Sequence, residues 1–298
     1  MKTEFVELDK LINIDKSQLI FLSARPGMGT TTLAVNIATN IALHQNIPVL
    51  FFSLEENYLD SHMKELNYDE LRKPSDDLPF NCLAERIISY EEMIEKDCFE
   101  KIRKLYSYSE KSIELDKEKV KQKINSGINK IKKSKFYIKD KAPVTIDEII
   151  SDIEEYVNGK GVKFVVIDYL QLIQYDKSKL VRRDKEIADI IEKLKEIISK
   201  LNITLLVTSQ ISHVIDSRNN HRPILIDLIE SENMIEMADT IIFLYRDEYY
   251  NLDTKMKSIA ELNIAKNNNG NTDTIDLIYL NKYFKFANFD KVLENSLH

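Results

Sequence analysis

The sequence contains little cysteine, glycine and proline, and no tryptophan. Among its 298 residues there are two cysteines, six glycines and six prolines. Cys82 and Cys98 are too few for a disulfide framework, and no second pair of cysteine or histidine lies at the spacing of zinc ligands, so two reduced thiols are favoured over half of a zinc site. The sequence also lacks a cleavable signal and a run of about 20 apolar residues. We therefore expect a cytoplasmic protein that does not enter a membrane.

An excess of positive charge is also missing. The 42 Lys and Arg residues against 49 Asp and Glu residues give a net charge of -7 at pH 7. Contacts with nucleic acid would have to come from local basic patches, which excludes a purely electrostatic, histone-like binder. The hydrophobic content of 43% is enough to bury a substantial core in a chain of this length. We expect one large domain or a domain with an insertion.

Short apolar runs typical of strands alternate along the chain, mostly with helix-like stretches. They span residues 19–22, 49–52, 164–167, 205–207 and 241–245. This alternation predicts an α/β fold, with a mostly parallel sheet covered by helices on both faces. Near the C-terminus, residues 259–265 and 274–280 flank an Asn-rich stretch that includes Asn269-Gly270, which predicts an antiparallel hairpin.

The interval between the second and third of these strands, residues 57–162, is rich in Glu, Lys and Ile and has few glycines. We expect it to be helical. Thr145 to Glu148 has the pattern of a capping box, which predicts the start of the last helix of the interval, ending near Gly159. The lysine-rich part, about residues 59–135, is either a nucleic-acid surface or a solvated helix face. Its interspersed glutamates and the helical spacing of its isoleucines favour the second interpretation.

The segment that follows the first strand, Ser23 to Thr32, has the pattern of a phosphate-binding loop except at one position. In a strand-loop-helix unit, backbone N–H groups and the positive end of the helix surround nucleotide phosphates, and Gly29 allows a close approach. Thr31 stands where a hydroxyl binds magnesium. Thr30 stands in place of the usual lysine, so a charge-assisted contact of about 1.5–3 kcal/mol is lost. A glycine-containing turn without a ligand is the alternative. The residues expected to bind a nucleotide are Arg25, Pro26, Gly27, Met28, Gly29, Thr30, Thr31 and Thr32.

Polar residues end three of the predicted strands. Asp168 follows residues 164–167, and the carboxyl ends of parallel strands form the edge at which open α/β folds bind ligands. Asp168 is therefore expected to hold magnesium, through its water, beside Thr31, although an aspartate that only caps a turn is the alternative. Glu55 and Gln210 follow two other strands, at the positions of a water-activating base and a γ-phosphate sensor.

The order of these motifs resembles the C-terminal RecA-like motor domain of DnaB-type replicative DNA helicases. The resemblance rests on Ala-Arg-Pro-x-Met-Gly in the loop, Phe-Ser-Leu-Glu after the second strand, Ile-Asp-Tyr-Leu-Gln-Leu-Ile around Asp168, Ser-Gln after the fourth strand, Ala238-Asp239, Tyr245 to Glu248, and Lys266 near Asn269-Gly270. It covers about Glu7 to Asn288 except for the lysine-rich part, which is longer than usual. It implies a RecA-like P-loop NTPase, one domain over residues 1–298 with a helical insertion at about 59–135 and without the family's N-terminal helical domain.

The resemblance also implies a hexameric ring that binds ATP and magnesium between subunits and moves along single-stranded DNA. Glu55 would polarise the attacking water, Thr31 and Asp168 would hold magnesium, and Gln210 would sense the γ-phosphate. The family's DNA-binding loops follow Ile173 and Gln210, and their contacts with phosphates would be salt-dependent and independent of base sequence. Exposed loop cations without this role are the alternative. The basic residues in these loops are Lys177, Lys179, Arg182, Arg183, Arg218 and Arg222.

Three departures from the family pattern fall on the nucleotide site. Thr30 replaces the loop lysine, Asn268 replaces the family's arginine finger, and Ile229 replaces another arginine. Because an arginine finger raises the rate by about 10³–10⁵, we expect weak hydrolysis, although Lys266 or Arg25 could partly substitute.

These departures lead to three hypotheses. The first is a binding or regulatory partner in DNA replication that hydrolyses ATP weakly or not at all. The second is an active ATP-dependent helicase. The third is a RecA-type recombinase or loader paralogue, against which Tyr169-Leu170-Gln171 argues. The expected partners are a nucleotide, single-stranded DNA, and further copies of the chain or a replication protein.

Overall fold

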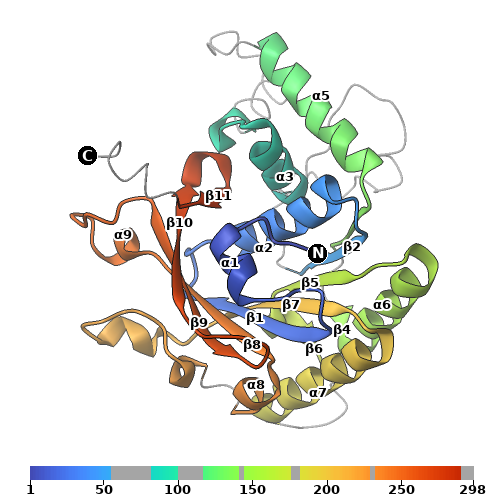
Figure 1. Cartoon of the computed structure of the whole chain (residues 1–298), viewed down its shortest axis with the longest axis vertical. Coiled ribbons are helices and arrows are strands. Elements are labelled where there is room, and N and C mark those ends of the chain that lie inside the picture. Colours follow the sequence, from blue (N-terminus) through green and yellow to red (C-terminus); the bar gives the residue numbers. More distant parts are fainter. Residues whose placement is uncertain (55–81, 100–116, 141–143, 176–181, 229–231, 290–298) are drawn as a thin grey trace.

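The computed structural model describes residues 1–54, 82–99, 117–140, 144–175, 182–228 and 232–289. The strands of its main sheet are β1 (Gln18–Ala24), β2 (Val49–Ser53), β3 (Phe136–Lys139), β5 (Phe164–Asp168), β7 (Thr204–Gln210), β8 (Thr240–Tyr245), β9 (Ile259–Asn267), β10 (Thr274–Leu280) and β11 (Lys285–Asn288). They are arranged in the order β11-β10-β9-β8-β1-β7-β5-β2-β3 (Figure 1). The strands from β8 to β3 are mutually parallel, and β9, β10 and β11 continue the sheet in antiparallel pairs. Two short strands, β4 (Val144–Thr145) and β6 (Ile173–Gln174), pair separately.

Helices cover both faces of the sheet (Figure 1). They are α1 (Val6–Leu11), α2 (Thr30–Thr39), α3 (Cys82–Glu92), α5 (Lys117–Lys133), α6 (Ile146–Lys160), α7 (Arg183–Leu201), α8 (Glu232–Met237) and α9 (Asp247–Tyr250), with a π-helical turn η1 (Asn40–His44) and 3₁₀ turns η3 (Leu170–Leu172), η4 (His213–Ser217), η5 (Leu225–Asp227) and η6 (Asn281–Tyr283). In β1, Ile20 and Leu22 pack with α2, whereas Leu19 and Phe21 pack with α6 and α7. Burial on both faces explains the continuous apolar runs of the strands. The predicted parallel sheet with two helical layers is confirmed.

Strand β3 was not predicted, because it lies inside the interval expected to be helical. It pairs with β2 at the end of the sheet. Phe136 at its start is buried, and its ring centroid lies 6.1 Å from that of Phe51 on β2. Four residues are too few to display a period that separates a strand from the helices on either side. Apart from β3 and the two-residue strand β4, helices α3, α5 and α6 confirm the helical character of the described part of the interval.

Helix α5 carries most of the described lysines of the lysine-rich part and packs on α3. The two helices approach closely at Gly127, where an added Cβ would stand 2.9 Å from Cγ2 of Ile88. Ile124 is buried on the same side, whereas Lys130 is exposed and its Nζ lies 2.9 Å from Oε1 of Glu92. This separation of apolar and charged side chains agrees with the interpretation of α5 as a solvated helix face.

Helix α6 begins at the predicted capping box. The backbone N–H of Glu148 donates to Oγ1 of Thr145 at 3.3 Å, and the backbone N–H of Thr145 donates to a carboxylate oxygen of Glu148 at 2.9 Å. The helix ends at Lys160, one residue beyond Gly159, because the next residue, Gly161, takes the left-handed conformation with φ of 69°. A glycine adopts this conformation without the steric cost of a Cβ.

The C-terminal hairpin of β9 and β10 is also confirmed, but its turn is wider than the pair Asn269-Gly270 suggests. Pairing between the two strands ends at Asn263 and Thr274. Beyond it, the side chain of Asn267 donates to the carbonyl oxygens of Leu11 and Asn271, at 2.9 and 3.0 Å. These side-chain bonds hold the loop against the N-terminal segment of the chain.

The sheet register brings the ends of its central strands to one edge. Ala24 of β1 pairs with Gln210 of β7, and Ser53 of β2 pairs with Asp168 of β5. The segments that leave these strands therefore start beside one another at the carboxyl edge of the sheet. Separately, no helix within the described ranges combines the length and the apolar character needed to cross a bilayer.

Candidate functional site

The loop between β1 and α2 is shaped by two glycines. Gly27 and Gly29 have φ angles of 84° and 105°. A Cβ at Gly29 would lie 3.2 Å from Cζ of Phe286, and a Cβ at Gly27 would lie 3.2 Å from Cε2 of Tyr249. Helix α2 begins directly after Gly29 without a side-chain cap. The loop thus exposes the positive end of a helix at the sheet edge, an arrangement that suits phosphate groups.

A cavity of about 280 Å³ lies over this loop. It is lined by Ala24, Arg25, Pro26, Gly27, Gly29, Thr30, Thr31, Thr32, Arg86, Asp168, Tyr169, Thr208, Ser209, Gln210, Tyr279 and Phe284. The predicted nucleotide and magnesium residues therefore meet in one place, with the exception of Met28, which is buried beneath the loop. Glu55 and Ile229 lie outside the described residues.

Asp168 ends β5 inside the cavity. Its side chain is 1% exposed, and one carboxylate oxygen accepts a hydrogen bond from Oγ1 of Thr208 at 2.5 Å. The sequence did not single out Thr208, because a threonine within an apolar strand resembles any other β-branched strand residue. The structure shows that Thr208 fixes the orientation of the carboxylate.

Gln210 ends β7 and is held by Gln171 from the turn after β5. The side-chain N–H of Gln171 donates to the carbonyl oxygen of Gln210 at 3.0 Å, and its side-chain oxygen accepts from the backbone N–H of Gln210 at 3.3 Å. Both bonds engage the backbone of Gln210. Its side chain is therefore presented at the cavity by a fixed main chain.

The donors in the cavity fit magnesium better than a softer metal. Thr31 offers a hydroxyl and Asp168 a carboxylate, and hard oxygen ligands of this kind suit Mg²⁺, which also keeps water and phosphate ligands. Within the described ranges, no cluster of three or more His, Cys, Asp or Glu side chains could hold a metal by protein ligands alone. The pair therefore fits an ion that arrives with a phosphate.

Arg25 lines the cavity but is turned toward η4. Its Nη2 lies 2.7 Å from a carboxylate oxygen of Asp216, and its Nη1 donates to the carbonyl oxygen of Ile211 at 3.3 Å. Burial acts to raise the pKa of Asp216, but hydrogen bonds from Tyr250 and Arg25 outweigh it and lower the pKa. The lowered pKa favours the charged form of the Asp216 carboxylate, with which Arg25 is paired.

Lys266 and Asn268 lie on or just beyond β9, outside the lining of the cavity. Nζ of Lys266 donates to the carbonyl oxygens of Ile235 and Glu236, at 2.7 and 3.1 Å, and burial lowers its pKa. The backbone N–H of Asn268 donates to the carbonyl oxygen of Asp239 at 2.8 Å. Lys266, which was predicted to be catalytic, therefore does not line the cavity of its own chain.

Arg86 is a cavity residue that sequence analysis missed. It comes from α3, and its Nη1 donates to Oγ1 of Thr32 at 2.9 Å. Its guanidinium carbon lies 4.8 Å from the centre of the Phe284 ring. The helical pattern of this part of the sequence gives no signal of which side chain points toward the loop, because that depends on how α3 packs on α2.

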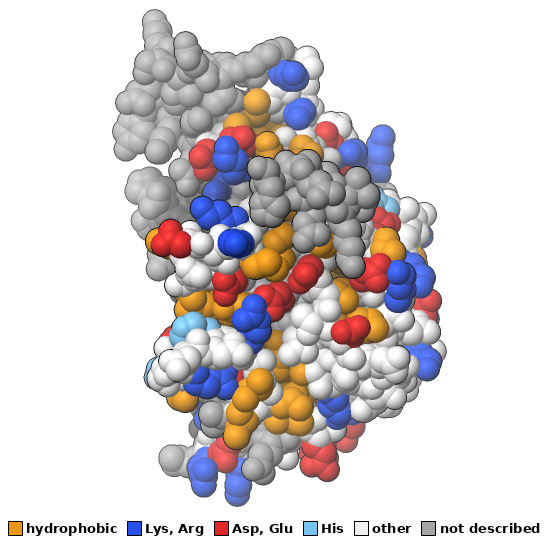
Figure 2. Space-filling model, turned by 60° about the vertical axis from the view of Figure 1, so that its left-hand side comes forward, with side chains coloured by type: hydrophobic (Ala, Val, Ile, Leu, Met, Phe, Trp, Pro, Cys, Tyr) orange, Lys and Arg blue, Asp and Glu red, His pale blue; other side chains and the backbone are white. Residues whose placement is uncertain are grey.

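The arginines predicted to contact DNA each contact an acidic side chain. The pairs are Arg182 with Asp184 at 3.1 Å, Arg183 with Glu186 at 3.0 Å, Arg218 with Asp227 at 2.7 Å, and Arg222 with Glu261 at 2.5 Å. The hydrogen bonds from Arg222 to Glu261 raise the pKa of the guanidinium. Figure 2 shows the same mixture on one face, where Lys and Arg side chains lie among Asp and Glu rather than in a uniformly basic patch. Lys177 and Lys179 lie outside the described residues.

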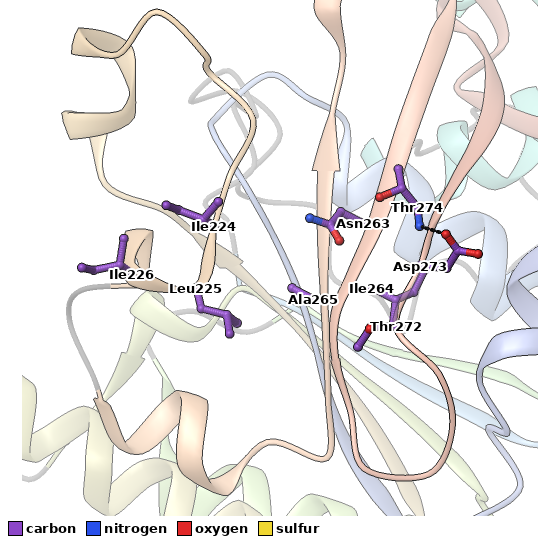
Figure 3. A pocket seen from close by; sticks show the side chains of 9 residues that line it. All are labelled: Ile224, Leu225, Ile226, Asn263, Ile264, Ala265, Thr272, Asp273 and Thr274. Carbon is purple, nitrogen blue, oxygen red and sulfur yellow. Dashed lines mark hydrogen bonds between the residues drawn. The ribbon is translucent and has the colours of Figure 1, made fainter.

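A larger hollow of about 600 Å³ lies elsewhere, between the η5 segment and the β9–β10 hairpin (Figure 3). It is lined by Ile224, Leu225, Ile226, Asn263, Ile264, Ala265, Thr272, Asp273 and Thr274. Its lining is mostly apolar and Asp273 is its single ionisable side chain, whereas the cavity over the loop collects hydroxyl, carboxylate, amide and guanidinium groups. The smaller cavity is therefore the better candidate for chemistry.

Comparison with known proteins agrees with this geometry. The chain is 30% identical to the replicative DNA helicase DnaB of Geobacillus stearothermophilus, and the match covers 97% of this chain and 56% of that protein. It is also 30% identical to the replicative DNA helicase DnaC of Bacillus subtilis (strain 168), where the match covers 99% of this chain and 58% of that protein. It thus spans a little over half the length of these relatives.

Solved structures agree as well. The chain is similar to a solved ATPase domain, with a TM-score of 0.79, 28% identity, and coverage of 97% of this chain and 91% of that domain. A second solved structure, a DnaB-like replicative helicase described with its interactions with primase, has a TM-score of 0.78 and 28% identity to this chain. The match covers 97% of this chain and 62% of that one. These likenesses confirm the RecA-like fold predicted from the sequence. Residues 1–71 and 75–288 match one family along almost the whole chain. On this match, and on the loop, carboxylate and glutamine that share one cavity, the chain belongs to the family of DnaB-like helicase C-terminal domains.

Proposed function

We propose that this chain is the nucleotide-binding core of a DnaB-like protein of DNA replication, which binds ATP with magnesium but hydrolyses it slowly. The observation that carries the proposal is the cavity that joins Thr31, Asp168 and Gln210 while position 30 is a threonine. The groups that bind and orient a triphosphate are retained, whereas the cation that the loop normally supplies is replaced by a hydroxyl.

Binding would begin at the loop between β1 and α2. The backbone N–H groups after Gly29 would surround the β-phosphate, and the positive end of α2 would favour its charge. Thr31 and Asp168 would hold magnesium, which supplies charge neutralisation at the phosphates. The bond from Thr208 keeps the Asp168 carboxylate in place for this contact.

Hydrolysis would require groups that this chain supplies incompletely. Glu55 would activate the attacking water, and Gln210 would contact the γ-phosphate. Charge on the transferring phosphoryl group is normally stabilised by a fixed cation from a neighbouring subunit, and Asn268 carries no charge. We therefore expect the bound nucleotide to persist, so that the chain acts as a binding or regulatory component.

The proposal includes single-stranded DNA and an oligomer. Arg182, Arg183, Arg218 and Arg222 would contact phosphates without regard to base sequence, after exchanging their present acidic partners for DNA. A hexameric ring would place Asn268 and Lys266 of one copy near the cavity of the next. Because a solved relative is described with primase, we include a replication protein among the partners.

Calorimetry and turnover measurements test the proposal together. Titration of the purified protein with ADP and with ATPγS, with and without magnesium, is expected to show binding that magnesium strengthens. Steady-state ATPase assays with single-stranded DNA are expected to stay well below about 1 s⁻¹, the lower end of ordinary phosphoryl-transfer enzymes. Absence of nucleotide binding contradicts the proposal as a whole, and brisk turnover contradicts its slow-hydrolysis part.

An active ATP-dependent helicase motor is the second candidate. It is favoured by the two bonds that hold Gln210, because a fixed γ-phosphate sensor would be dispensable in a chain that bound nucleotide without hydrolysing it. In this case Glu55→Gln abolishes a measurable DNA-stimulated ATPase. An unchanged rate in that variant argues for the slow-hydrolysis function.

A further inference from the structure

Lysines lie along the amino edge of the main sheet, opposite the edge that carries the cavity. Lys16 lies two residues before β1, Lys163 directly precedes β5, and Lys135 directly precedes β3. Because these strands are parallel, the residues before them emerge at one edge. The three positions come from distant parts of the sequence, and the sheet brings them together.

Hydrogen bonds of the intervening strands join these positions into a row. The backbone N–H of Val49, the first residue of β2, donates to the carbonyl oxygen of Lys135 at 2.9 Å. Strand β2 pairs with β5, which follows Lys163. The backbone N–H of Thr204 donates to the carbonyl oxygen of Lys163 at 3.0 Å, and its hydroxyl donates to that of Lys16 at 2.8 Å. Since neighbouring strands lie about 4.8 Å apart, the row from β1 to β3 spans about 20 Å.

The positive charge of this edge is not balanced by acidic side chains. The last turns of α5 and α6 add three lysines to the row, and all six side chains are exposed. Within the described ranges no ion pair engages any of them, whereas Lys130 and Lys200 contact Glu92 and Glu154. In a chain with a net charge of -7, this is a local basic patch. The six amino-edge lysines are Lys16, Lys132, Lys133, Lys135, Lys160 and Lys163.

A row of like charges fits a polyanion with regularly spaced charges. Duplex DNA carries one negative charge per about 1.7 Å of its axis, so a span of about 20 Å faces the phosphates of about six base pairs. Lysine contacts phosphate as a point charge, without reading the base sequence.

The side chains available at this edge favour a duplex over two other polyanions. A single strand normally stacks its bases on aromatic side chains. In the described part of the chain, however, the one exposed Phe or Tyr is Tyr249, which lies beside Gly27 at the opposite edge. An acidic protein segment would normally dock on an apolar core, but the exposed large apolar side chains belong to other described segments.

We infer that the amino-edge lysines bind the phosphate backbone of double-stranded DNA. This surface is separate from the nucleotide cavity and from the loops predicted to contact a single strand, because those follow the carboxyl ends of β5 and β7, whereas Lys163 precedes β5. The inference goes beyond the proposed function and depends on neither nucleotide binding nor hydrolysis. The two edges of one sheet would then contact duplex and single strand separately.

Fluorescence anisotropy with a labelled blunt duplex of about six helical turns or fewer, titrated at several salt concentrations, tests the inference. The variant Lys16→Gln/Lys135→Gln/Lys163→Gln is expected to bind the duplex about tenfold or more weakly in low salt. The slope of log affinity against log salt concentration is expected to become shallower by about 2 to 3, since each lost phosphate contact removes about 0.9. Unchanged affinity and slope overturn the inference.

A matched control removes the same charge elsewhere on the surface. Lys255→Gln/Lys257→Gln/Lys282→Gln changes three exposed lysines of the loop before β9 and of η6. This variant is expected to retain the duplex affinity of the wild type. Equal losses in both triple variants indicate a general effect of net charge and contradict a site at the amino edge.

A second measurement uses the unaltered protein. Acetylation of lysines, mapped by mass spectrometry, is expected to be blocked by the duplex at Lys16, Lys135 and Lys163, while Lys255 stays reactive. Protection by a single strand but not by the duplex overturns the inference. Binding of labelled poly-L-glutamate without binding of the duplex also overturns it, and assigns the lysines to an acidic protein segment. Titration with ADP is independent of these results, so the proposed nucleotide binding is tested separately.

Discussion

At the scale of single residues, the proposed function distinguishes the groups that would bind a triphosphate from those that would hydrolyse it. In this proposal Thr31 and Asp168 would offer oxygen donors to magnesium, whereas Thr30 and Asn268 stand at positions where the family pattern has cations. Sequence analysis predicted that Thr31 and Asp168 lie together, because the loop pattern places Thr31 at the start of a helix and the carboxyl ends of parallel strands, such as the one that ends in Asp168, meet at the same edge. It could not predict Arg86, since the approach of a side chain from a separate helix depends on three-dimensional packing.

Replacing the carboxylate at the end of β5 tests the magnesium assignment. Asp168→Asn is expected to lower the affinity for ATPγS with magnesium by roughly tenfold or more, because a charged ligand is lost, and to leave magnesium-free binding nearly unchanged. Calorimetry with and without the ion measures both values. Asp253→Asn, at an exposed position of the loop before β9, is the control. Equal losses with and without magnesium contradict the assignment.

Restoring the two absent cations tests the account of slow hydrolysis. In the Thr30→Lys/Asn268→Arg double variant, ATP turnover with single-stranded DNA is expected to rise by about 10³-fold, the lower estimate for an arginine finger. Thr30→Lys/Asn271→Arg places the second charge on the same exposed loop, three residues away, and should not match this gain. A double variant as slow as the wild type contradicts the idea that missing cations limit the rate.

At the scale of helices and strands, apolar runs predicted the elements that are buried on both faces. Strands β1, β2, β5, β7 and β8 lie where continuous apolar segments occur, and the capping box marks the start of α6. The short edge strand β3 was missed because four residues give no distinct period. The width of the β9–β10 turn also could not be predicted from the sequence, because it depends on hydrogen bonds from the Asn267 side chain to the carbonyl oxygens of Leu11 and Asn271.

The end of α6 offers a matched pair of glycines. Gly159 lies inside the helix and Gly161 takes the left-handed conformation, with nothing within 4 Å of an added Cβ at either position. Gly159→Ala is expected to raise the free energy of unfolding by about 0.5–1 kcal/mol. Gly161→Ala is expected to lower it by about 1 kcal/mol, because alanine is strained at positive φ. Denaturant unfolding of both variants measures the difference, and shifts of the same sign contradict the described helix end.

At the scale of the whole molecule, segments far apart in the sequence meet around η1. Nδ1 of His44 lies 2.8 Å from a carboxylate oxygen of Glu4, and its Nε2 lies 2.9 Å from one of Glu91 on α3. Burial acts to lower the pKa of His44, but hydrogen bonds and charges from Glu4 and Glu91 outweigh it and raise the pKa above 6.5. This histidine therefore links the N-terminal segment, α3 and the end of the α2–η1 helix.

The linkage predicts a pH-dependent stability. Because the folded protein holds the proton more tightly, the contribution of His44 is complete below pH 6.5 and is lost as the pH rises through the raised pKa of the folded state. The difference in free energy of unfolding between wild type and His44→Gln is expected to be larger at about pH 5.5 than at about pH 8.5. His213→Gln, at an exposed position, is the control. A difference that does not change with pH contradicts the linkage.

Aromatic rings from β10 and β11 lie beside the loop between β1 and α2, although these segments are far apart in the sequence. Phe286 of β11 and Tyr279 of β10 occupy the space beside Gly29, and the side chain of Asn36 in α2 accepts a hydrogen bond from the backbone N–H of Phe286 at 2.7 Å. During synthesis the loop leaves the ribosome long before these strands do. A nascent chain that stops short of β10 lacks the aromatic side chains beside Gly29, so the cavity is complete only after β10 and β11 have been synthesised.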